Sequence, residues 1–172
     1  KIMAILPIVR VPDPLLKKIS KPVNKVDDKL RSFMDDMLET MYDAPGIGLA
    51  AVQVGKLLRI LVIDTSRGEE DPNPNFYINP EITWTSKDIN IYNEGCLSVP
   101  EQYADIERPA ECKVKFLDYS GDLQEIHATN LLATCIQHEM DHLNGIVFID
   151  YLSKLKRGMY VRKVKKYTME ED

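Results

Sequence analysis

The sequence predicts an α+β fold, with mostly antiparallel sheets packed around a central helix and a further helix toward each end of the chain. Two observations carry this prediction. Strand-like segments follow one another in runs, and helical patterns occur at three separate places. We see no regular alternation of strand and helix, the pattern that indicates a parallel sheet. The 172 residues suit one domain with one sizeable core.

The first predicted helix covers residues 27–43. Asp27 or Asp28 can cap its first turn, because a carboxylate accepts a hydrogen bond from an unpaired backbone N–H, and Ala-Pro-Gly at 44–46 ends it. The apolar residues recur at helical spacing, which indicates a face packed on the core. These residues are Leu30, Phe33, Met34, Met37, Leu38 and Met41.

Strand patterns follow in the middle of the chain. Residues 57–64 form an apolar run with the length of a buried strand, and residues 77–86 and 89–92 alternate weakly between apolar and polar side chains. Residues 112–128 are typical of a hairpin that turns at Ser120-Gly121. These segments would supply the antiparallel sheets.

The central helix is predicted to run to Asn144, with Thr129 or Asn130 as its cap and Gly145 as its stop. Residues 146–152 are then expected to be extended. A third, basic helix at about 153–168 would begin at a capping serine.

Composition and charge restrict the partners of the chain. Its formal net charge is −5, from 22 basic and 27 acidic residues, which argues against a surface built for DNA or for a membrane. No apolar run approaches the roughly 20 residues that a membrane span needs. Three cysteines and no convincing signal peptide fit a reducing cytoplasm.

The central helix carries a metal-binding pattern. His138 and His142 are four residues apart, so both imidazoles lie on one side of a helix and can bind one ion. Glu139 is offset by one position and can act as a base toward a water on that ion. Chance occurrence of two surface histidines is the weaker interpretation, because this motif combines three specified residues.

A catalytic metal site usually takes three protein ligands. The position of the third histidine in metzincins holds Phe148, and the chain that follows is basic, so we expect the ligand upstream. Cys96 is favoured because it lies between Gly95 and Pro100, in a constrained stretch, and because a thiolate binds borderline and soft divalent ions well. The other candidates remain open: Cys112, Cys135 and His127.

Three stretches together resemble a known family. Residues 46–55 (GIGLAAVQVG), 94–98 (EGCLS) and 137–142 (QHEMDH) are similar, in order and spacing, to the three signature motifs of peptide deformylase in its bacterial type 1 form. The likeness extends to VPDPLLKK near the start and HLNGIVFIDYLS near the end. It implies a single deformylase-like catalytic domain over residues 1–172.

The resemblance implies an activity and a metal. The enzyme would hydrolyse the N-formyl group from the initiator methionine of nascent chains and release formate. Cys96, His138 and His142 would bind one divalent ion, natively Fe²⁺, which Zn²⁺, Ni²⁺ or Co²⁺ can replace. We also expect Asp141 and Arg108 to support this site as an ion pair.

The resemblance also implies which residues meet the substrate. Gln53, the backbone N–H of Leu97 and the region of Gly48 would polarise the formyl group. Tyr103 stands where the type 1 pattern often has an arginine that contacts the peptide beyond methionine. The methionine pocket would be lined by Ile47, Tyr92, Leu131, Thr134 and Cys135.

Two other functions fit the sequence less well. A zinc endopeptidase lacks its usual downstream ligand here, and a non-enzymatic metal-structural or ribosome-binding module has no use for the base Glu139. The basic residues at 154–166 most commonly form a solvated helix face. Their alternative role is an electrostatic contact with the ribosome, which would depend strongly on salt.

Overall fold

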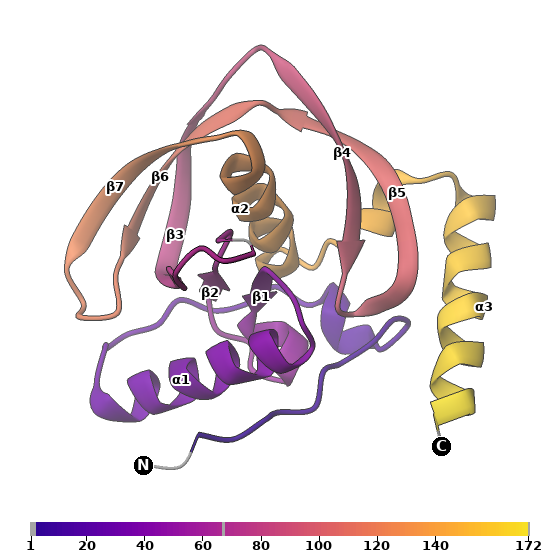
Figure 1. The fold of residues 1–172 in the computed structure, drawn as a ribbon, viewed down its shortest axis with the longest axis horizontal. Coiled ribbons are helices and arrows are strands. Elements are labelled where there is room, and N and C mark those ends of the chain that lie inside the picture. Colours follow the sequence, from indigo (N-terminus) through magenta and orange to yellow (C-terminus); the bar gives the residue numbers. More distant parts are fainter. Residues whose placement is uncertain (1–2, 67, 172) are drawn as a thin grey trace.

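The computed structural model describes residues 3–66 and 68–171. It confirms the α+β class, since antiparallel sheets lie on either side of helix α2 (Asn130–Leu143), which runs through the middle of the molecule (Figure 1). Helix α1 (Asp28–Asp43) lies beneath the sheets in this view. Helix α3 (Lys154–Glu171) lies at the right-hand edge of the molecule. The central helix is therefore enclosed by sheet, which buries most of its side chains.

The larger sheet has five strands in the order β1-β2-β3-β6-β7, and its neighbouring strands pair antiparallel. All four residues of β2 are buried, in agreement with its apolar run. The predicted hairpin between β6 and β7 is confirmed, and Gly121 turns it with a φ of +90°. The strands are β1 (Gly48–Ala50), β2 (Ile60–Ile63), β3 (Asn75–Thr85), β6 (Glu111–Leu117) and β7 (Leu123–Thr129).

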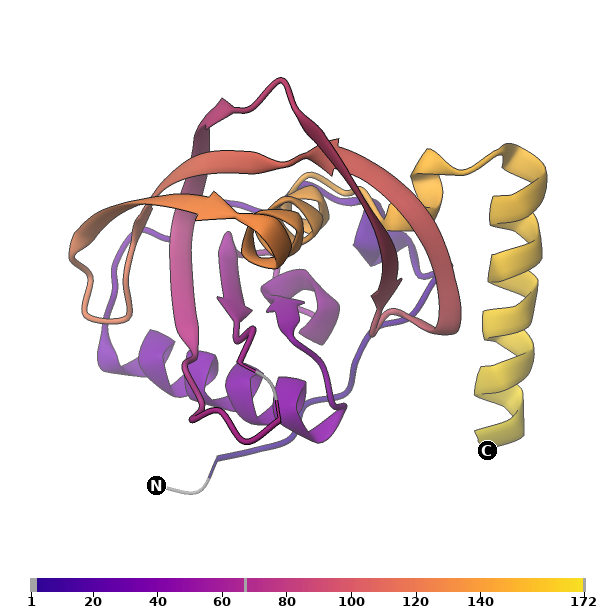
Figure 2. The same cartoon turned by 45° about the horizontal axis from the view of Figure 1, so that its top comes forward.

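The smaller sheet pairs β4 (Ile89–Cys96) with β5 (Val99–Pro109), and both strands arch over one side of α2 (Figure 2). Most of β5 lies outside the strands that the sequence pattern predicts. Alternate residues of β5 do face inward, but one of them is the charged Arg108, which interrupts the apolar pattern that marks a half-buried strand.

Helix α1 agrees with its prediction. The Asp27 side chain accepts a hydrogen bond from the Leu30 N–H at 2.9 Å, which satisfies one of the unpaired donors of the first turn. Met34, Met37 and Met41 are fully buried and pack against β1 and β2 as one core cluster. The methionine stripe is therefore core packing.

The segment after α2 differs from its prediction. Gly145 ends the helix with a φ of +75°, as expected, but residues 148–151 form a short 3-10 helix instead of an extended segment. Asp150 accepts a hydrogen bond from the Val147 N–H at 3.0 Å, and the Leu152 N–H donates to the Ile149 carbonyl at 3.1 Å. These local bonds close a turn that apolar periodicity alone does not reveal.

Replacing Gly145 with alanine is expected to destabilise the protein more than the same change at Gly55. Both glycines have positive φ, which costs about 1–3 kcal/mol for other residues. At Gly145 a Cβ would also collide with the Lys17 carbonyl oxygen, whereas nothing lies within 4 Å at Gly55, so overpacking adds about 1–3 kcal/mol. Urea unfolding of both variants measures the difference, and equal losses would contradict it.

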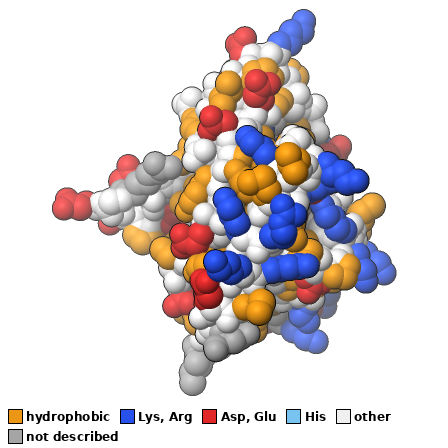
Figure 3. All heavy atoms as spheres, turned by 90° about the vertical axis from the view of Figure 1, so that its right-hand side faces the viewer, with side chains coloured by type: hydrophobic (Ala, Val, Ile, Leu, Met, Phe, Trp, Pro, Cys, Tyr) orange, Lys and Arg blue, Asp and Glu red, His pale blue; other side chains and the backbone are white. Residues whose placement is uncertain are grey.

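Helix α3 begins where predicted, with the Ser153 hydroxyl accepting a hydrogen bond from the Lys156 N–H at 3.2 Å. It packs along β5, and Val164 is fully buried in that contact. Lysine and arginine side chains gather over its outer face (Figure 3). Within residues 3–66 and 68–171, no helix has both the length and the apolar character needed to cross a membrane.

Candidate metal centre

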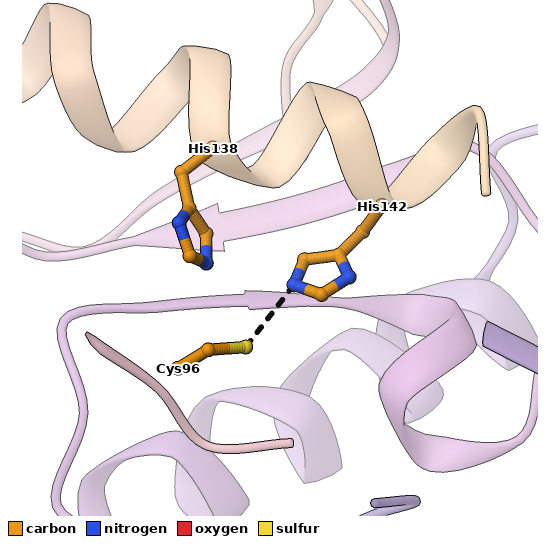
Figure 4. Close-up of side chains that lie close together, drawn as sticks. All are labelled: Cys96, His138 and His142. Atoms are coloured by element: carbon orange, nitrogen blue, oxygen red, sulfur yellow. Dashed lines mark hydrogen bonds between the residues drawn. The ribbon is translucent and has the colours of Figure 1, made fainter. Parts of the chain in front are cut away.

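Three side chains from two elements converge beneath α2. His138 and His142 project from the helix, and Cys96 projects from the end of β4 (Figure 4). One ligand atom from each lies within 4.8 Å of the other two, and Cys96 Sγ is 3.3 Å from His142 Nε2. One thiol and two imidazoles form a donor set that suits a borderline divalent ion such as Fe²⁺ or Zn²⁺.

The other candidate ligands lie elsewhere. Cys112 is buried in the core, where burial raises the pKa of its thiol to about 11. Cys135 is buried on α2 and belongs to the same core cluster. His127 is on β7, where its Nε2 lies 3.0 Å from a carboxylate oxygen of Glu111. Among the described residues, only the group with Cys96 has the geometry to hold a metal.

A series of hydrogen-bonded polar side chains, which runs from the buried Glu94 to the exposed Tyr151, orients His138. Its Nδ1 lies 2.8 Å from Glu94 Oε1, which leaves Nε2 for an ion. Arg108 donates two hydrogen bonds to Glu94, at 2.7 and 3.0 Å, and a third to Asp141 at 2.9 Å. The expected ion pair of Asp141 and Arg108 is therefore confirmed. At the far end of this series, the Tyr151 hydroxyl donates a hydrogen bond to the Asp141 carboxylate at 2.6 Å.

Glu94 was not identified from the sequence. Burial would raise its pKa, but hydrogen bonds from His138 and Arg108 outweigh that effect and lower the pKa, so the carboxylate stays ionised. Its position two residues before Cys96 was the available signal, because alternate residues of a strand share a face. His142 differs, since burial and the nearby His138 lower its pKa and favour the neutral imidazole that binds metal.

Glu139 lies at the same site. It is 4% exposed, and burial raises its pKa to about 7. Its Oε1 is 3.8 Å from His138 Nε2, and its Oε2 is buried without a hydrogen-bond partner among the described residues. The absence of a side chain at Gly48 makes room for this carboxylate. A Cβ at that position would lie only 2.8 Å from Glu139 Oε1. A buried carboxylate with an unpaired oxygen is suited to accept a proton.

Gln53 adjoins the ligand cysteine. It lies in a short 3-10 helix (Ala51–Val54) and accepts a hydrogen bond from the Ala50 N–H at 2.9 Å. Its Nε2 donates to Ser98 Oγ at 3.0 Å and to Cys96 Sγ at 3.4 Å. Ser98, which the sequence analysis did not identify, is fully buried and fixes this amide.

A cavity of about 770 Å³ opens from the ligands to the surface. Its walls bring together the residues expected around a substrate, while Gln53 and His142 are buried more deeply. The predicted residues in the lining are Ile47, Gly48, Tyr92, Cys96, Leu97, Tyr103, Leu131, Thr134, Cys135, His138 and Glu139.

Comparisons with known proteins identify the family of this chain. Residues 5–158 match the family model described as polypeptide deformylase. A peptide deformylase of Mesorhizobium japonicum is 56% identical over 169 residues, which cover 98% of this chain and 96% of the relative. A peptide deformylase structure from Ehrlichia chaffeensis matches with a TM-score of 0.94 and 45% identity, over 98% of this chain and 99% of that one.

A further structure, a class I type b peptide deformylase from Acinetobacter baumannii with Met-Ala-Ser bound, matches with a TM-score of 0.84 and 32% identity. The match covers 88% of this chain and 100% of that one. The fold, the ligand geometry and these relatives lead to one conclusion. The chain belongs to the polypeptide deformylase family, metal-dependent hydrolases that remove the N-formyl group from the N-terminal methionine of newly synthesised proteins.

Proposed function

We propose that this chain releases formate from N-formylmethionyl peptides by a site in which Cys96, His138 and His142 hold one divalent ion. The observation that carries the proposal is the buried base Glu139 beside these three ligands, in a cavity that opens to solvent. When bound, the ion supplies Lewis acidity, which lowers the pKa of a water and polarises a carbonyl. Three protein ligands favour a catalytic site over a structural one, which usually has four.

Glu139 moves the proton. It takes a proton from the attacking water and delivers it to the nitrogen of the methionine as the formyl C–N bond breaks. Burial raises the pKa of Glu139 above that of an ordinary carboxyl group, so the group holds the proton that it takes more readily. The products are formate and a free amine.

The Gln53 side chain and the backbone N–H of Leu97 donate hydrogen bonds to the formyl oxygen. As water attacks, negative charge grows on that oxygen, and donors fixed beforehand stabilise it. The Gln53 amide is held by Ala50 and Ser98, so it needs little reorganisation. Of its two N–H donors, the one bonded to Ser98 Oγ stays in place, and the one directed at Cys96 Sγ would turn to the formyl oxygen.

The methionine side chain fits the apolar part of the cavity. An unbranched thioether adapts to such a pocket, and sulfur contacts an aromatic ring favourably. The Acinetobacter deformylase with bound Met-Ala-Ser supports this assignment by analogy. The residues proposed to line the pocket are Ile47, Tyr92, Leu131, Thr134 and Cys135.

Formate release from formyl-Met-Ala-Ser tests the proposal. The protein should be purified without oxygen and loaded separately with Fe²⁺, Ni²⁺, Co²⁺ and Zn²⁺. We propose Fe²⁺ as the native ion, so metal analysis after anaerobic purification should find iron, and exposure to peroxide should inactivate the enzyme because iron and Cys96 both oxidise. A protein that is inert with all four metals would contradict the assigned activity.

Replacing Gly48 with alanine is expected to lower kcat/KM about 10- to 100-fold without loss of metal. The new Cβ would lie 2.8 Å from Glu139 Oε1 and displace the carboxylate, and an error of about 1 Å in a catalytic group costs about 100-fold. Gly158→Ala is the matched control, because its Cβ would meet only the flexible end of Arg162 at 3.4 Å. Equal rates in both variants would exclude this role of Gly48.

We also propose that the outer face of α3 contacts the ribosome in the cytoplasm, where the substrate emerges. Its exposed lysines can neutralise phosphates, and such binding weakens as salt rises. A variant with Lys156, Lys163 and Lys166 changed to glutamine should co-sediment less with ribosomes at low salt.

The matched control changes three exposed lysines outside α3 to glutamine: Lys25, Lys29 and Lys87. Substitution is preferable to truncation, since the helix buries Val164 in the core. Equal loss of binding in both variants would show that the contact depends on total charge and not on α3.

A further inference from the structure

A second cavity lies beside α3, apart from the metal ligands. It has a volume of about 640 Å³ and is formed by parts of residues 11–17, 149–150 and 154–162. We call it the α3 cavity, and we call the larger one, which reaches the metal ligands, the metal-site cavity. No described residue lines both of them. The α3 cavity is therefore a separate candidate site, and its volume is typical of sites for small molecules.

Helix α3, which forms one wall of the α3 cavity, is held by contacts outside it. Arg10 donates to both carboxylate oxygens of Glu171, at 2.5 and 3.3 Å, and these two residues are also part of the wall of the metal-site cavity. The Tyr160 hydroxyl donates to the backbone carbonyl of Tyr103 at 2.7 Å, and Val164 is fully buried. A wall fixed in this way needs little reorganisation when a ligand binds, which favours affinity.

The floor of the α3 cavity is apolar. Val11, Leu16 and Ile149 are buried side chains of one core cluster, and they close the cavity toward the interior. Val161 is partly buried and Pro12 is exposed, so both offer apolar atoms to a ligand. An apolar group that leaves water for this floor would gain binding free energy.

The charged side chains of the α3 cavity are mostly basic. Lys17 and Asp150 form an ion pair, so these two charges largely offset each other. Arg157 contacts the same carboxylate more weakly, with its Nη1 3.9 Å from Oδ1. Lys154 and Arg162 form no ion pair with another described residue. The cavity therefore has basic groups that are available to an anion.

One further acidic side chain opposes this charge. Asp13 is exposed, and its Oδ1 accepts a hydrogen bond from the Leu15 N–H at 2.9 Å, which caps the 3-10 helix Pro14–Lys17. Among the described residues that line the cavity, four are basic and two are acidic. An excess of positive charge beside an apolar floor favours a ligand that is apolar at one end and negative at the other.

We propose that the α3 cavity binds a small amphipathic anion. Its apolar body lies on the floor, and its carboxylate or phosphate group is held by Lys154, Arg157 and Arg162. Guanidinium groups suit such headgroups, because they can donate two parallel hydrogen bonds. This binding does not depend on the proposed function.

Helical spacing separates this site from the proposed ribosome contact. Lys154, Arg157 and Val161 are three and four residues apart, so they share one face of α3. Lys156 and Lys163 are seven residues apart and lie on the opposite face. The two proposed contacts of α3 therefore use different side chains.

Decanoate, used below the concentration at which it forms micelles, tests the proposal. Calorimetric titration of the metal-loaded chain, with an excess of the product peptide Met-Ala-Ser to occupy the metal-site cavity, should show one bound decanoate. Octanoate should bind about threefold to tenfold more weakly, because each buried methylene contributes to affinity. Decyltrimethylammonium, which has the opposite charge, should bind more weakly by about tenfold.

Variants assign the binding to its residues. Changing Lys154, Arg157 and Arg162 to glutamine should weaken decanoate binding about fivefold to 50-fold. Val161→Ser keeps the charges and should weaken it about twofold to fivefold, because it removes apolar contact. The matched control removes three positive charges elsewhere and should leave the affinity unchanged, and its substitutions are Lys25→Gln, Lys29→Gln and Lys87→Gln.

Three results would overturn the inference: no binding of decanoate beside Met-Ala-Ser, equal affinity for decanoate and decyltrimethylammonium, or equal loss of affinity in both triple variants. The comparison of ligands uses the unaltered protein, so it does not depend on how the variants fold. Vesicles of phosphatidylglycerol separate a free ligand from a membrane surface. Binding to these vesicles without binding of monomeric decanoate would identify a membrane contact and would also reject the proposal.

Discussion

Changing Glu139 to glutamine is expected to lower kcat for formate release about 10²–10⁴-fold while the protein keeps its metal. Glutamine preserves the shape of the side chain but cannot accept the proton from water. The carboxylate is buried with one unpaired oxygen beside the metal-binding residues. Of the other carboxylates that line the cavity, Glu94 is bonded to His138 and Arg108, Glu171 is bonded to Arg10, and Glu101 is exposed to solvent.

Single-turnover release of formate, together with metal analysis of the same sample, measures both parts of this prediction. Glu125→Gln serves as the control for loss of one negative charge. A Glu139→Gln enzyme that works within tenfold of the wild-type rate would show that another group moves the proton. Loss of metal in that variant would instead assign Glu139 to the ligand set.

Changing Cys96 to alanine is expected to weaken metal binding by more than about 100-fold, because altering even the partners of metal ligands costs 10- to 100-fold. The sulfur is one of three ligand atoms within 4.8 Å of one another, and its removal leaves two imidazoles. Competition with a chelator under anaerobic conditions measures the affinity, and formate release should fall in parallel.

Cys112→Ala is the matched control for this prediction. It also deletes a thiol, but one buried in the core among apolar side chains. This substitution should destabilise the protein slightly, because it leaves a small cavity in the core. It should leave the metal content and the activity unchanged. Equal metal affinity in Cys96→Ala and wild-type protein would remove Cys96 from the site.

Local periodicity predicted much of the site. His138 and His142 are adjacent because a helix places residues four apart on one face, and the cap of α1 and the stop at Gly145 follow from equally local rules. The third ligand could not be fixed in that way. Local spacing leaves four upstream candidates, and the fold brings only Cys96 together with both histidines among the described residues.

What could not be predicted depends on contacts between distant segments. Glu94 contacts His138, and Ser98 contacts Gln53, only because β4 and the following turn fold against α2 and Gln53. Strand β5 was missed because Arg108 faces inward, and an inward charge is tolerated there since Glu94 and Asp141 bind it. Apolar patterns carry no information about such partners.

The bonds between Arg10 and Glu171 join positions that are 161 residues apart in the chain. Bringing together residues so far apart in the sequence lowers the conformational entropy of the chain before their contacts can offset that loss. Contacts of this kind therefore slow folding. During synthesis the first segment must wait until the last helix has been made before this wall of the cavity can form. The centre around α2 can assemble earlier, since Gln53, Cys96 and both histidines precede α3. An enzyme that acts on nascent chains would thus complete this wall of its own cavity only after α3 has been synthesised.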